Sequence, residues 1–68
     1  MRYITKMTGV EMRRIRRRAE MSRGEFADEF DLSDSSIGMM ENGKTPVRKV
    51  TAMAVRYFEN KYLGGPEN

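Results

Sequence analysis

The 68-residue sequence contains neither cysteine nor histidine. The first absence excludes disulfide bonds and thiolate chemistry, and the second removes the commonest general base and metal ligand. No apolar run approaches the roughly 20 residues of a membrane span, and the N-terminus lacks the pattern of a secretory signal. A chain this short also has little room for a catalytic cleft. We therefore expect one small cytoplasmic domain that is not an enzyme and needs no metal or cofactor.

Charge is nearly balanced in amount but uneven in position. Lysine and arginine number 13 against 10 acidic residues, which gives a net charge of +3 and a pI of about 9.6. Residues 13–18 include five arginines, whereas residues 25–34 are acidic. A basic patch of this kind indicates a polyanionic partner, and the alternative is a solvated helix face.

A first helix is expected to begin at Thr8, because Thr8 and Glu11 have the spacing of a capping box. Its apolar stripe would consist of Met12, Ile15 and Ala19. The remaining arginines, at positions 13, 14, 17 and 18, fall on the other side of the helix. Arg16 differs, since it lies beside Met12 at the margin of the stripe, which makes it a candidate for a partly buried ion pair.

The segment 22–43 predicts two short helices joined by a tight turn. Ser22 and Ser33 are N-cap residues, and Glu25 completes a capping box with Ser22. Only three or four residues remain between the two helices, which is the spacing of a helix-turn-helix. In the second helix, the 3.6-residue period directs Ile37 inward. The same period directs Ser35 and Met39 outward, with Ser36 beside them and Asp34 at the N-terminal end.

A fourth helix is expected from Pro46 to Leu63, with Thr45 as its N-cap and Pro46 in its first turn. It carries two apolar stripes: Val50, Met53, Ala54 and Tyr57 in one, and Val55, Phe58 and Tyr62 in the other. Because one small core cannot bury both stripes, we expect Val55, Phe58 and Tyr62 to form a homodimer interface. The alternative is a single wide core stripe.

The sequence resembles the Cro/lambda-repressor-like (XRE-type) helix-turn-helix family. The matching features are Ser22, Glu25, Phe26-Ala27, Leu32-Ser33, Ile37 and the run Glu41-Asn42-Gly43-Lys44 with Pro46 following. The resemblance implies an all-α fold, a compact four-to-five-helix lambda-repressor-like domain over residues 8–63. Outside the resemblance, the alternation of Tyr3 and Ile4 with Arg2 and Thr5 indicates a short strand or an arm over residues 1–7, with a frayed terminus as the alternative. Residues 64–68 are expected to form a tail.

The resemblance also implies site residues. The base-contacting residues would be Asp34, Ser35, Ser36 and Met39, on the helix expected to enter the major groove. Asp34 has an alternative role, because its charge also suits a helix N-terminus. The phosphate-contacting residues would be Arg23, Asn42, Lys44, Thr45 and Arg48. The family commonly pairs an arginine at the position of Arg16 with a glutamate at the position of Glu41.

Three residues depart from the family pattern. The family usually has glycine at the helix ends occupied here by Glu20 and Asp31, because those ends favour positive φ. Gly38 stands in the middle of the expected recognition helix, where glycine costs up to about 1 kcal/mol relative to alanine. It either permits a close backbone approach to DNA or is tolerated without a role.

These features predict a sequence-specific transcriptional regulator that binds double-stranded DNA, a repressor acting as a homodimer on a palindromic operator. No small-molecule effector is indicated, and no membrane partner. The alternative function is an antitoxin-like or other protein-interaction module that uses the helix expected at residues 46–63.

Overall fold

The computed structural model describes residues 6–66. Within this range the chain forms four helices and no strand: α1 (Gly9–Arg18), α2 (Arg23–Glu29), α3 (Asp34–Glu41) and α4 (Lys49–Leu63). The predicted all-α, helix-turn-helix architecture is therefore confirmed. The arm or strand suggested for residues 1–7 lies mostly outside the described residues, as does the end of the tail. None of the four helices has the length and apolar character needed to cross a membrane.

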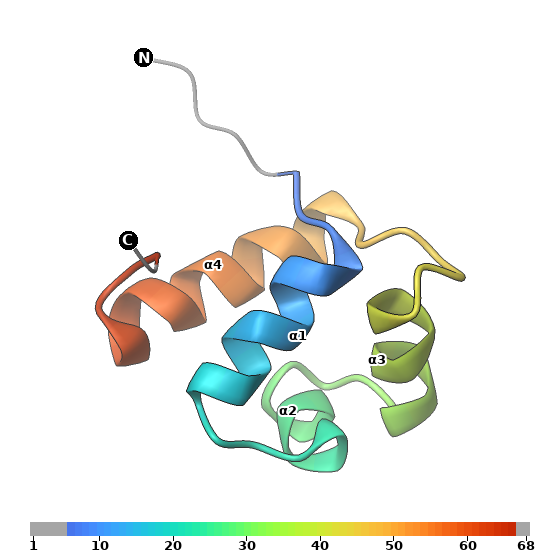
Figure 1. Ribbon diagram of the computed structural model, residues 1–68, viewed down its shortest axis with the longest axis horizontal. Coiled ribbons are helices and arrows are strands. Elements are labelled where there is room, and N and C mark those ends of the chain that lie inside the picture. Colours follow the sequence, from blue (N-terminus) through green and yellow to red (C-terminus); the bar gives the residue numbers. More distant parts are fainter. Residues whose placement is uncertain (1–5, 67–68) are drawn as a thin grey trace.

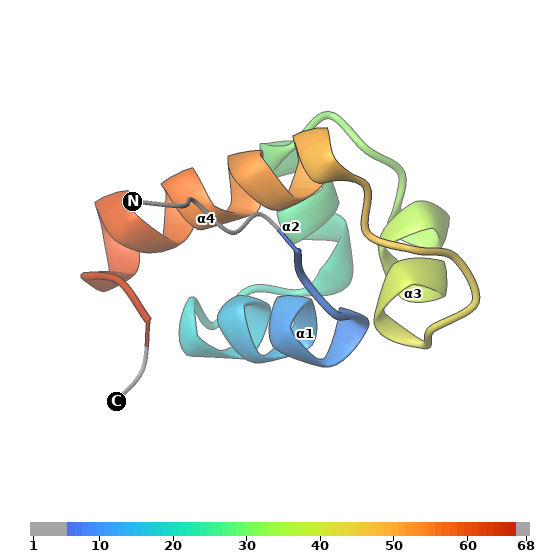
Figure 2. The same ribbon diagram turned by 90° about the horizontal axis from the view of Figure 1, so that it is seen from above.

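Helix α1 occupies the middle of the molecule, with α4 on one side and α3 on the other (Figure 1). Helices α2 and α3 follow one another through a short turn and pack against each other. The two views agree that α3 and the C-terminal end of α4 lie at opposite ends of the 34 Å long axis (Figures 1 and 2). Helix α3 therefore lies at one end of the molecule, where its inner side packs against α1 and α2.

Local hydrogen bonds fix where the first three helices begin. The Thr8 hydroxyl accepts from the backbone N–H of Glu11 at 3.1 Å, and the Glu11 carboxylate accepts from the Thr8 N–H at 3.0 Å. Ser22 and Glu25 repeat this capping box at 3.1 and 2.8 Å. Ser33 caps α3 through its hydroxyl alone. The predicted starts of these three helices are confirmed.

The core forms where the inner faces of the helices meet. Its buried apolar side chains include Met7, Met12, Ile15, Phe26, Ala27, Ile37, Met40, Ala52, Val55 and Phe58. Three aromatic rings join α2 to α4. Phe58 lies edge-to-face against Phe26 at 5.9 Å and against Phe30 at 5.5 Å between centroids, and Phe26 meets Phe30 at 4.8 Å. Edge-to-face contacts between aromatic rings stabilise the packing of α2 against α4 beyond the effect of the buried apolar area alone.

The prediction for α4 was wrong in two respects. The helix begins at Lys49, with Arg48 as an N-cap that makes no side-chain hydrogen bond, so the Thr45–Pro46 start is three residues early. Val47 packs against the core before the helix starts. Residues 46–48 have no regular secondary structure and precede the helix.

The assigned faces of α4 were also reversed. Val55 and Phe58, expected at a dimer interface, are buried in the core of their own chain, and only Tyr62 of that set is exposed. Val50 and Tyr57, expected in the core, are 79% and 65% exposed. Both stripes have helical spacing, so periodicity alone could not decide which one faces α1 and α2.

The turns on either side of α2 contain residues in the left-handed region. Glu20 and Asp31 both have φ of 57°, at the positions where the family resemblance implied glycine. This conformation destabilises a residue with a side chain by roughly 1–2 kcal/mol, and aspartate adopts it more readily than glutamate does. The two turns therefore keep the expected geometry at the cost of local strain.

Gly9 allows α1 to approach the end of α3 closely. A Cβ atom at this position would overlap the backbone carbonyl oxygen of Met40 and would lie 3.0 Å from the Cα of Glu41. Both contacts are with backbone, which cannot move aside as a flexible side chain would. The first residue of α1 therefore fixes the spacing between α1 and α3.

We predict that Gly9→Ala lowers the free energy of unfolding by about 2–3 kcal/mol, because the added methyl group forces α1 away from α3. In a domain of this size, each kcal/mol corresponds to a melting-temperature shift of roughly 4–8 °C. Gly24→Ala is the matched control, since a Cβ at Gly24 meets nothing closer than 4.0 Å. The control is expected to melt at or slightly above the parent temperature, and equal melting of both variants would contradict the assignment.

Candidate nucleic-acid interface

The outward face of α3 presents the side chains that the sequence assigned to DNA. Ser35 and Met39 are exposed, while Ile37 and Met40 are buried on the opposite side of the helix. A shallow surface depression is lined by Arg23, Asp34, Ser35, Gly38, Met39, Asn42 and Lys44. The structure thus brings three of the four predicted base-contacting residues together with three of the five predicted phosphate-contacting residues.

The other predicted contacts lie around this depression. Ser36 is half-buried, and its hydroxyl is hydrogen-bonded to that of Ser33 at 3.0 Å, so it takes part in the cap of α3. Thr45 is half-exposed and lines a neighbouring hollow with Lys44 and Lys6. Arg48 is exposed at the start of α4. The cationic side chains therefore follow the loop that connects α3 to α4.

Glu41 at the end of α3 is held by arginines of α1. Its side chain is only 2% exposed. Arg16 donates to it from Nε at 2.7 Å and from Nη2 at 3.0 Å, and donates from Nη1 to the carbonyl of Met21. The hydrogen bond with Glu41 raises the pKa of Arg16 above its ordinary value. This arrangement is the pair that the family resemblance suggested.

Arg13 adds a contact that sequence reasoning missed. It was assigned to the solvent side of α1, yet its Nη2 donates to the carbonyl of Glu41 at 3.3 Å and to Oδ1 of Asn42 at 3.0 Å. Asn42 therefore reaches the edge of the depression with its side-chain oxygen already bonded to α1. Arg13 lies one helical turn from Arg16, on the side of α1 that faces α3, and this spacing was the available signal.

Arg23 and Asp34 form an ion pair at the N-terminal ends of α2 and α3. Nε of Arg23 lies 3.2 Å from Oδ1 of Asp34, and each side chain is about half exposed. The two residues had been assigned separately, one to phosphate and the other to bases. Their contact means that a ligand that reaches one of the two charges also meets the other.

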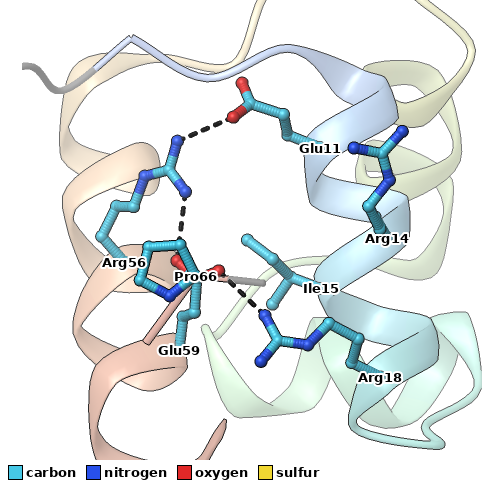
Figure 3. A pocket seen from close by; sticks show the side chains of 7 residues that line it. All are labelled: Glu11, Arg14, Ile15, Arg18, Arg56, Glu59 and Pro66. Atoms are coloured by element: carbon cyan, nitrogen blue, oxygen red, sulfur yellow. Dashed lines mark hydrogen bonds and ion pairs between the residues drawn. The ribbon is translucent and has the colours of Figure 1, made fainter. Parts of the chain in front are cut away.

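A second polar network joins α1 to α4 (Figure 3). Arg56 bridges Glu11 at 2.9 Å and Glu59 at 3.1 Å, and Arg18 reaches the other oxygen of Glu59 at 3.1 Å. Hydrogen bonds from the Thr8 amide and from Arg56 hold the pKa of Glu11 below its usual value. Arg18 had been assigned to the solvent side of α1. The missed signal was Glu59 itself, a carboxylate on the buried stripe four residues after Val55, which requires a cationic partner.

The polar groups of this surface are suited to binding. Every buried side-chain nitrogen or oxygen in the described part of the chain has a hydrogen-bond partner. Residues 6–66 contain no group of three histidine, cysteine, aspartate or glutamate side chains placed to hold a metal ion. The depression presents hydroxyl, thioether, amide and cationic groups, together with the carboxylate of Asp34. Hydroxyl, amide and cationic groups suit contact with base edges and phosphates.

A family model described as a helix-turn-helix domain matches residues 9–58, which is most of the chain and includes α1, α2, α3 and the larger part of α4. No curated protein and no solved structure matches.

We predict that Glu41→Ala lowers the free energy of unfolding by about 3 kcal/mol or more, because it leaves Arg16 unpaired in a largely buried position. Urea denaturation measures the loss. Glu29→Ala is the control, since Glu29 is exposed on α2, and it should change stability by less than about 0.5 kcal/mol. The double variant Arg16→Met, Glu41→Leu should be more stable than Glu41→Ala; a double variant that is less stable would show that the unpaired charge is not the cause.

Proposed function

The chain belongs to the helix-turn-helix domain family, and from that premise we propose that it is a transcriptional regulator that recognises a specific sequence in double-stranded DNA. Domains of this family are typically non-enzymatic. We propose further that the protein is a repressor and that it acts as a homodimer on a palindromic operator.

The observation that carries this proposal is the exposure of Ser35 and Met39 on the outward face of α3. A helix that is anchored on its inner side and open on its outer side can enter the major groove, which is wide enough to admit an α-helix. We assign base contacts to these two residues. Ser36, with its hydroxyl engaged by the cap, lies at the edge of the contact.

We assign phosphate contacts to Asn42, Lys44, Thr45 and Arg48, in and after the loop that leaves α3. Lys44 and Arg48 are exposed, and neither forms an ion pair within the described residues. Their charges are therefore available to the backbone of DNA. Contacts of this type set the position of a protein on the duplex and make binding dependent on salt.

We propose repression because a regulator that occupies a DNA site excludes other proteins from that site, so binding alone is enough to repress. The homodimer proposal rests on the exposed apolar stripe of α4. Val50, Met53 and Tyr57 follow one another at spacings of three and four residues, and all three are exposed. A two-fold axis through this stripe would present two α3 helices to two half-sites.

Selection of bound duplexes from a random pool tests the proposal directly. We predict a palindromic site whose half-sites are separated by about one helical turn of DNA, or a multiple of it. Affinity for that site should fall steeply with salt, with a slope of about 0.9 per phosphate contacted. Failure to bind any duplex even at low salt would reject DNA recognition and favour the protein-interaction module.

Two variants distinguish phosphate contacts from base contacts in the same assay. Lys44→Ala should weaken binding to all sequences alike and reduce the salt slope by about one. Ser35→Ala should keep the salt slope and alter discrimination at one base position. If both variants give the same uniform loss, Ser35 does not read bases.

For the dimer, we predict that Met53→Asp yields a folded monomer by sedimentation, because the substitution places a charge in the apolar stripe of α4. Met39→Asp is the matched control: the two methionines are 46% and 42% exposed, and the control should retain the dimer mass. Phe58→Asp should unfold the protein instead, since Phe58 lies in the core. A Met53→Asp protein with the mass of the parent would exclude this face of α4 from the interface.

A further inference from the structure

Gly38 is buried in the middle of α3, although this helix faces solvent at the depression. The space that a side chain would occupy there is filled by Arg23 of α2. A Cβ atom added at Gly38 would lie 2.6 Å from Nη1 and 3.5 Å from Cζ of Arg23. The guanidinium group therefore lies directly against the backbone of α3, in a position that only glycine permits.

Asp34 holds the guanidinium group in that position. Asp34 and Gly38 are four residues apart, so they lie one above the other on the same face of α3. Oδ1 of Asp34 is 3.2 Å from Nε of Arg23. The side chain of Arg23 thus begins on α2 but ends on α3, between the carboxylate and the glycine.

This placement argues against a phosphate contact for Arg23. A phosphate that approached Arg23 would also approach the carboxylate of Asp34, and the two negative charges would repel each other. The pair is close to neutral for a distant anion. It still presents nitrogen donors, because the guanidinium group has five N–H bonds in a rigid fork and its contact with Asp34 is made through Nε.

We propose that Arg23 is a base-reading residue that recognises guanine in the major groove, with Asp34 as its positioning residue and Gly38 as the site where its guanidinium group rests. The proposal rests on the proposed function. Arg23 lines the same depression as Ser35 and Met39, which places its fork among the groups assigned to base edges. Arginine donating to O6 and N7 of guanine is the commonest specific contact in this groove. The assignment replaces the phosphate role of Arg23 and the base-contacting role of Asp34.

The test uses the duplex selected by the parent protein. Each base pair is replaced in turn, and affinities are measured for the parent and for Arg23→Lys, Asp34→Asn and Gly38→Ala. For the parent, replacement of one G·C pair in each half-site should cost about 5- to 150-fold in affinity. Arg23→Lys should lose most of that discrimination at this pair alone. Its salt slope should stay unchanged, because lysine keeps the charge but cannot reproduce the fork.

The other two variants test how Arg23 is positioned. Asp34→Asn and Gly38→Ala should reduce discrimination at the same G·C pair, the first by releasing Nε and the second by displacing the guanidinium group. Gly24→Ala, next to Arg23 on α2, should leave the whole series of affinities unchanged. If Gly38→Ala fails to fold by circular dichroism, Arg23→Lys and Asp34→Asn carry the test without it.

Two results would overturn the inference. One comes from Arg23→Gln, measured in the same series: a loss of affinity that is equal for every duplex and accompanied by a lower salt slope would identify a phosphate contact. The other is an Arg23→Lys protein that discriminates at every position as the parent does. A parent protein that binds no duplex would instead reject the proposed function, so the two failures are distinguishable.

Discussion

The position of α3 depends on one buried carboxylate. The carboxylate of Glu41 accepts hydrogen bonds from Nε and Nη2 of Arg16, and Arg13 donates to the backbone carbonyl of Glu41. At the same point, Gly9 lets the backbone of α1 touch the backbone of α3. The C-terminal end of α3 is therefore fixed by charge and by close packing together. Because these contacts use only its inner side, the outer side is left open for another molecule.

A domain of this size has few apolar side chains with which to orient its helices. Ion pairs between helices therefore help to fix the relative orientation of the helices. Arg56 and Arg18 converge on Glu59, and Arg56 also reaches the cap of α1 through Glu11 (Figure 3). Ion pairs of this kind add little net stability compared with apolar replacements, but breaking one leaves an unpaired charge, which disfavours other arrangements of the helices.

The features that the sequence predicted well are local. Thr8, Ser22 and Ser33 cap helices through bonds that span three residues, so the starts of α1 to α3 could be inferred without knowledge of the fold. The features that it missed depend on neighbours distant in sequence. Both stripes of α4 are apolar, and only the positions of Phe26 and Phe30 decide that Phe58 faces inward. Likewise, Gly38 has no explanation until Arg23 is seen to lie across it.

Arg18 joins α1 to the backbone at the end of α4, at the end of the molecule remote from α3. Its Nη2 donates to the carbonyl oxygens of Leu63 at 3.1 Å and Gly65 at 2.9 Å, so the backbone that follows α4 is tied to α1. The same guanidinium group also engages Glu59. A fluorophore, an affinity handle or a fused polypeptide attached after Pro66 would thus emerge from an anchored point at the end of the long axis opposite to α3 (Figure 1). Attachments there are suited to immobilising or labelling the protein without covering the surface of α3.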